Sequence, residues 1–160
     1  RGWRDQIGDE FAFDFIYRGK IKLQQDLFWD LERLEIIPDY GFTLGSVHRS
    51  AQLGALVRYG WNMPADFGPG YLDMPMSGIG KAEAGRHSLY FFTRPAVNLV
   101  EHNRFLTGLD EEPVVGQVSL GLVYRYRSLE LGYTQTFMTR QWEEQDANDS
   151  YGEFIVTWLF

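Results

Sequence analysis

The chain has 160 residues, a formal net charge of −7 at pH 7 and no cysteine. The lack of cysteine excludes a disulfide framework and a thiolate metal site. The acidic balance, with few basic clusters, argues against nucleic acid as a partner. No apolar run approaches the ~18 residues that a transmembrane helix needs, which excludes a helical membrane protein.

Apolar and polar residues alternate along almost the whole chain, as in antiparallel strands with two different faces. The alternation predicts an all-β fold with seven strands, at residues 9–24, 27–46, 51–61, 87–101, 113–126, 128–141 and 150–160. The boundary of the first strand has a second interpretation, because Arg18-Gly19-Lys20 also fits a turn.

The connections between these strands differ in length. Val47–Ser50 is predicted to be a tight connection, and Tyr126–Ser128 leaves room only for a sharp hairpin. Three connections are long, at residues 62–84, 102–112 and 143–149. Short turns on one side and longer loops on the other are typical of outer-membrane barrels, although the longest loop could break that rule.

Each strand carries one apolar, aromatic stripe, which faces lipid in a transmembrane barrel and forms the core of a soluble β-sandwich. The predicted strands are longer than the ~5 to 6 residues usual in soluble sheets, which favours the barrel. Aromatic residues also gather near strand ends, where an interfacial belt would lie. The belt would comprise Tyr17, Trp29, Tyr59, Trp61, Tyr124, Tyr126, Phe137, Trp142, Tyr151 and Trp158.

Polar residues occupy the opposite side of the same strands and are expected to line the barrel interior and pair with one another. They are Asp14, Arg18, Arg58, Arg94, Asn98, Arg125 and Glu130. The spacing of His48, His87 and His102 predicts no metal cluster. The acidic residues between Glu143 and Asp149 lack an EF-hand pattern and are predicted to form a solvated loop.

The last predicted strand places Phe154, Val156, Trp158 and the terminal Phe160 on one face. This ending resembles that of bacterial outer-membrane barrel proteins, whose final phenylalanine is recognised by the barrel-assembly machinery. Such single-chain barrels have an even number of strands, and an isolated seven-stranded sheet would leave open edges in lipid. Residues 1–160 are therefore expected to form one domain, the C-terminal part of a larger barrel whose N-terminal strands are missing.

Several stretches together resemble a known family, the lipid A 3'-O-deacylases of Gram-negative outer membranes. They lie at residues 2–6 with 9–10, 37–38 with 43–47, 58–62 with 66–69, 103–108, and 132–135 with 139–140. The resemblance implies a twelve-stranded barrel, of which five strands precede this chain. The barrel is expected to be a monomer. It also implies a calcium-dependent esterase in the bacterial outer membrane that removes ester-linked acyl chains from the lipid A of lipopolysaccharide.

The resemblance further implies two site residues. Glu10 matches the family's catalytic glutamate, whereas Arg4 stands where the family has the histidine proposed as general base. A guanidinium effectively never sheds its proton, so Arg4 cannot act as a base. It can instead clamp a lipid A phosphate, or it is a cation without a catalytic role. Glu10 orients a catalytic group, ligates calcium or pairs with an arginine; the metal ligands are otherwise unknown.

Two functions therefore stand side by side. The first is a lipid A 3'-O-deacylase-like esterase. The alternative is a non-catalytic outer-membrane barrel that binds lipopolysaccharide or forms a pore, and Arg4 at the histidine position is the feature that favours it.

Overall fold

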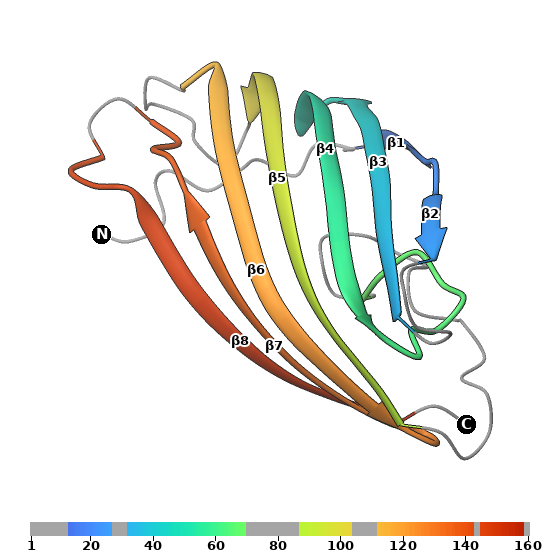
Figure 1. Cartoon of the computed structure of the whole chain (residues 1–160). Helices are drawn as coiled ribbons and strands as arrows, with labels where there is room; N and C mark the ends of the chain where they lie inside the picture. The colour runs from blue at the N-terminus through green and yellow to red at the C-terminus, as the bar shows by residue number, and fades with distance from the viewer. Residues whose placement is uncertain (1–12, 27–31, 70–86, 104–111, 143–144, 159–160) are drawn as a thin grey trace.

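The computed structural model describes residues 13–26, 32–69, 87–103, 112–142 and 145–158, and these form one antiparallel sheet (Figure 1). Its strands are β1 (Asp14–Lys20), β2 (Leu23–Asp26), β3 (Glu32–Gly45), β4 (His48–Trp61), β5 (His87–Asn103), β6 (Val114–Tyr126), β7 (Leu129–Met138) and β8 (Asp149–Trp158). The strand order is β1-β3-β4-β5-β6-β7-β8, and β2 also pairs with β3. The described residues contain no helix that is long and apolar enough to cross a membrane.

The first predicted strand is in fact two strands, which lie end to end along β3. β1 pairs with the second half of β3 and β2 with its first half. The break between them faces Pro38, which accepts a hydrogen bond from the Ile21 amide (N to O, 3.0 Å) but has no amide proton to return. Residues 18–20 belong to β1, so the prediction of a turn there is wrong. The predicted residues 9–12 lie outside the described part.

The tight connection after β3 is shorter than predicted. β3 ends at Gly45 and β4 already begins at His48, so the prediction that residues 48–50 belong to the turn is wrong. The hairpin between β6 and β7 is confirmed, since Arg127 and Ser128 alone connect the two strands. Arg127 has a φ of 53°, a left-handed conformation that a non-glycine residue adopts mainly in turns.

The sheet has two rims. At the C-terminal rim lie the end of β4, the start of β5, the β6–β7 hairpin and the end of β8, because Trp61 pairs with Leu89 and Leu129 with Trp158. At the N-terminal rim lie the start of β1 and the β3–β4 turn, since Asp14 pairs with Gly45. The connection after β4, the longest between the described strands, thus leaves from the same rim as the two-residue β6–β7 hairpin. Connection length does not distinguish the two rims.

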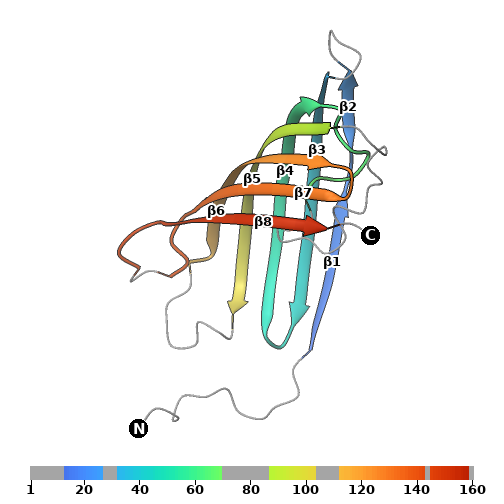
Figure 2. The ribbon, with the colours of Figure 1, turned by 90° about the horizontal axis from the view of Figure 1, so that it is seen from below.

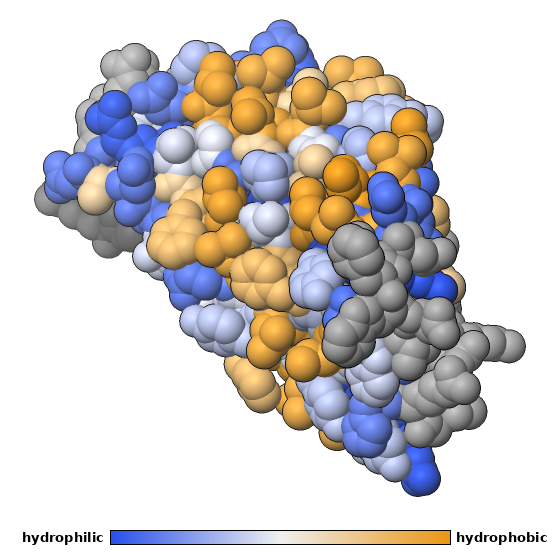
Figure 3. All heavy atoms as spheres, viewed as in Figure 1, coloured by the Kyte–Doolittle hydropathy of each residue, from blue (hydrophilic) through white to orange (hydrophobic). Residues whose placement is uncertain are grey.

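The two faces of the sheet are reversed relative to a soluble protein. Leu53 and Phe154 on the outer face are 67% and 69% exposed, whereas Arg94 on the inner face is 1% exposed. Figure 3 shows apolar side chains spread over the strands of the visible face. A soluble β-sandwich would bury its apolar stripe, so this arrangement contradicts that alternative and matches a barrel wall.

The sheet curves like part of a barrel wall (Figure 2). Within the described residues it is open, because β1 and β8 each pair on one side only. β3, β4, β5 and β6 have 14, 14, 17 and 13 residues. These lengths exceed the ~9 to 11 residues that a tilted strand needs to cross the hydrocarbon layer. The all-β barrel prediction is confirmed as a partial barrel.

A small apolar cluster interrupts the polar inner face. It contains Ile37, Leu56, Met63, Tyr90, Phe92 and Val123, each at most 5% exposed. Gly121 on β6 allows the ring of Phe92 to lie against the backbone, because a Cβ at this glycine would come within 2.3 Å of Phe92 Cζ.

A methyl group at Gly121 is therefore expected to destabilise the sheet. In Gly121→Ala the new Cβ would also lie 2.6 Å from the Tyr133 carbonyl oxygen, so the backbone must shift at a cost of about 1–3 kcal/mol. Gly116→Ala is the control, since its Cβ would meet nothing closer than 3.4 Å. Both variants of the complete protein are titrated with urea, and the folded, heat-modifiable band on a gel gives the midpoint of unfolding. Equal midpoints for the two variants would contradict this packing.

Candidate functional site

Arg58 on β4 is the centre of a buried ion network on the inner face. Its side chain is fully buried, and its Nε donates to Glu35 Oε2 at 2.5 Å. Its Nη1 donates to Asp66 Oδ1 at 2.5 Å, and its Nη2 donates to the Pro64 and Asp66 carbonyl oxygens. The guanidinium also lies over the Tyr90 ring, 5.3 Å from its centroid. The network therefore satisfies every nitrogen of this buried cation.

Asp66 extends the network to β6. Its Oδ2 lies 3.5 Å from Arg125 Nη2, and its Oδ1 accepts the Gly68 amide at 3.0 Å. Arg125 in turn pairs with Glu130 on β7, with 2.8 Å between Nε and Oε2. Because β5 separates β4 from β6, Asp66 joins two strands that do not touch each other.

A second buried pair lies nearer the N-terminal rim. Arg94 on β5 donates two hydrogen bonds to Asp39 on β3, from Nη2 to Oδ1 at 2.8 Å and from Nε to Oδ2 at 3.2 Å. This bidentate geometry suits the planar guanidinium. Arg94 Nη1 has no hydrogen-bond partner within the described structure. In the Arg58 network and in the Arg94–Asp39 pair, each charge has a partner of opposite sign. Both therefore have a structural role.

The structure confirms that Arg58, Arg94, Arg125 and Glu130 line the interior, where they are at most 4% exposed. Asn98 is half-buried there, and Asp14 and Arg18 lie exposed on the edge strand. Sequence reasoning did not assign Glu35, Asp39 or Asp66 to this network. Glu35 and Asp39 alternate with the outward-facing Ile36 and Tyr40, a signal that could have placed them on the inner face. Asp66 instead lies in a connection without periodicity.

The start of β1 is tied to the β3–β4 turn at the N-terminal rim. Asp14 Oδ1 accepts the amides of Val47 (3.2 Å) and His48 (3.3 Å). The Phe13 amide donates to Ser46 Oγ at 3.1 Å. These bonds fix where the segment that precedes β1 enters the sheet.

A polar hollow of about 140 Å³ adjoins this rim. Its polar side chains come from β1, β3, β4 and β5, and Arg18 Nη1 donates to Gln52 Oε1 across it at 3.4 Å. The lining residues are Arg18, Gly41, Phe42, Thr43, His48, Ser50, Gln52 and Asn98. Guanidinium, hydroxyl and amide groups are the types that bind phosphate and sugar hydroxyl groups.

The two predicted site residues, Arg4 and Glu10, lie outside the described residues, as does Phe160. The described part of the chain contains no group of three or more His, Asp or Glu side chains that could hold a metal ion. His87 instead accepts or donates a hydrogen bond with the Tyr124 hydroxyl, 2.6 Å from Nδ1. The expected calcium ligands are thus not identified among the described residues.

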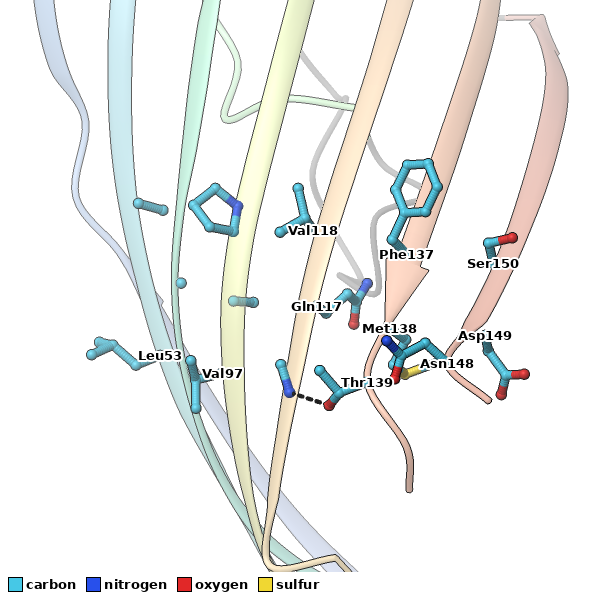
Figure 4. Close-up of a pocket in the computed structure, with 15 residues that line it drawn as sticks. Leu53, Val97, Gln117, Val118, Phe137, Met138, Thr139, Asn148, Asp149 and Ser150 are labelled. Atoms are coloured by element: carbon cyan, nitrogen blue, oxygen red, sulfur yellow. Dashed lines mark hydrogen bonds between the residues drawn. The ribbon is translucent and has the colours of Figure 1, made fainter. Parts of the chain in front are cut away.

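A larger hollow of about 810 Å³ crosses β4 to β8 (Figure 4). Leu53, Val97, Val118 and Phe137 supply exposed apolar side chains to its lining. A large apolar pocket is the usual candidate for a binding site, but catalysis also needs converging titratable groups. Among the described residues that line it, Asp149 alone is ionisable. The described lining of this hollow therefore lacks the converging titratable groups that catalysis needs.

Comparison with known proteins gives two findings. The family model described as outer membrane protein LpxR matches residues 1–160. The solved structure of LpxR from Salmonella typhimurium is similar with a TM-score of 0.75 at 15% sequence identity. The match covers 92% of this chain and 52% of that one, so the chain spans about half the length of this relative. At this identity the likeness shows the fold alone. The comparison with curated proteins gives no match.

Removal of the central cation is expected to be costly. Arg58→Met leaves two carboxylates facing each other in a buried site, which should lower the free energy of unfolding by about 3–5 kcal/mol. Arg49→Met is the matched control, because Arg49 and its partner Glu101 are 48% and 73% exposed and such pairs contribute about 0–1 kcal/mol. Urea titration of the complete protein in detergent compares the two variants. Similar losses in both would show that the Arg58 network is not structural.

Proposed function

Because the chain belongs to the family of outer membrane protein LpxR and is an outer-membrane protein, we propose that it forms part of a lipid A 3'-O-deacylase. Such an esterase hydrolyses the ester that holds an acyl chain on the lipid A of lipopolysaccharide. The observation that carries the proposal is the family match over residues 1–160. The TM-score of 0.75 to an LpxR structure supports the same barrel architecture.

The two rims support a position for the site. The resemblance implies that β8 ends on the periplasmic side, so the proposal places the C-terminal rim there. The N-terminal rim would then face the outer leaflet, in which lipopolysaccharide resides. β1 begins at this rim at Asp14, four residues after Glu10. The proposal assigns the site to this rim because Glu10 is four residues from Asp14 in the sequence.

The proposed roles follow from the chemistry of the side chains near this rim. Glu10 orients the reacting water or a catalytic group, and Arg4 binds a phosphate of the substrate. The polar hollow lined by Arg18, His48 and Gln52 adds groups that suit a phosphorylated sugar. A calcium requirement, recognition of Phe160 by the barrel-assembly machinery and a monomeric state belong to the same proposal and rest on the resemblance.

Lipid A composition tests the activity. Cells that express the complete coding sequence should contain lipid A that lacks one acyl chain, and Glu10→Gln should restore full acylation. Mass spectrometry of extracted lipid A, with calcium present or chelated, measures both outcomes. Glu153→Gln, the same substitution at an exposed carboxylate on β8, should leave the spectrum unchanged. Full acylation by the wild-type protein in both conditions would contradict the esterase.

Arg4→His separates the esterase from the alternative, a barrel that binds lipopolysaccharide without cleaving it. A histidine can shed its proton near neutral pH, so the substitution supplies the base that the family pattern contains. We expect at least a tenfold rise in the deacylated fraction of lipid A if the scaffold is competent. No deacylation by either form, with the variant folded and present in the outer membrane, would favour the binding function.

A further inference from the structure

The connection after β4 returns onto the inner face instead of leaving the sheet. Asn62 ends β4 with a φ of 50°, and its Nδ2 donates to the His87 carbonyl oxygen at 2.8 Å. Connections usually run over the surface, because their backbone groups need water. In residues 62–69, which we call the inner segment, five of the eight residues are nevertheless buried. They are Met63, Pro64, Asp66, Gly68 and Pro69.

Apolar contacts hold this segment at two points. Met63 is 5% exposed and joins the inner apolar cluster. Gly68 has a φ of 99°, which favours glycine, and a Cβ there would lie 2.3 Å from Leu56 Cδ2. The inner segment therefore approaches the wall too closely for a side chain at this position. The inner segment thus packs directly against the inner face of the sheet.

Polar contacts hold the segment from three sides. Asp66 is shared between Arg58 on β4 and Arg125 on β6. From the other side, Lys20 Nζ donates to the Phe67 carbonyl oxygen at 3.4 Å, and Lys22 Nζ donates to the Asp66 carbonyl oxygen. The Lys22 ammonium also lies 5.2 Å from the centroid of the Phe67 ring. The segment thus bridges the inner face from the β1 edge to β6.

We propose that the inner segment, residues 62–69, is a built-in plug that closes the barrel interior near the C-terminal rim. A water-filled channel would hydrate the charges that line it, yet Arg58 is 0% and Arg125 1% exposed here. Buried charges of this kind persist only when each one is paired and hydrogen-bonded. The complete barrel is therefore a closed body that does not conduct ions, whether or not it cleaves lipid A.

Conductance across planar lipid bilayers tests the plug. The complete wild-type protein should insert without discrete conductance steps. Replacement of residues 63–69 by a Gly-Ser sequence of equal length should produce discrete conductance steps at least tenfold above the wild-type background current, and Asp66→Asn should produce brief openings. Asp149→Asn is the matched control, because Asp149 is an exposed carboxylate outside the network. Stable conductance steps from the wild type, or a silent replacement variant that is folded, would overturn the proposal.

Thiol accessibility keeps the proposal testable where the replacement variant does not fold. The chain has no cysteine, so single cysteines can be introduced in a background free of others. Met63→Cys should react with a membrane-impermeant maleimide at least tenfold more slowly than Ala65→Cys, because residue 63 is buried and residue 65 is exposed. Equal rates in the folded protein would mean that the segment does not occupy the interior.

Discussion

The ion pairs of Asp66 with Arg58 and Arg125 hold together the half of the barrel described here. An outer face of leucine, valine and phenylalanine leaves no place for charge in contact with lipid, so Arg58 on β4, Arg94 on β5 and Arg125 on β6 all point inward. Inside, each one needs a partner, because removal of a charge from water costs several kcal/mol. Neighbouring strands supply some partners, but the Arg58 network also requires a carboxylate from the connection after β4.

Periodicity alone predicts most of the wall. Alternation of period two defines the strands and assigns each side chain to a face, because a slip of one residue would exchange the two faces. It fails where the backbone departs from the regular ladder. Pro38 on β3 lies opposite the break that divides the first predicted strand into β1 and β2. The β3–β4 turn is also shorter than its polar composition suggests. Asp66 was beyond reach for a different reason, since only the folded sheet brings its partners together.

The resemblance to lipid A deacylases now separates into two kinds of residue. The stretches 58–62 and 66–69 match the family pattern, and the structure joins them through the Arg58–Asp66 pair. A match at these positions therefore reports a requirement of the barrel interior, which a non-catalytic relative would share. The residues proposed for the site, Arg4 and Glu10, lie outside the described part.

The position of residues 62–69 on the inner face has a consequence for assembly in the membrane. A sheet that rolls into a cylinder encloses whatever already lies against its concave side, and later entry through a wall of hydrogen-bonded strands would require that wall to open. The Arg58–Asp66 pair, 8 residues apart in sequence, can form before the Arg125–Asp66 pair, whose partners are 59 residues apart. This connection therefore favours an order of folding in which its contact with β4 forms first and its contact with β6 follows.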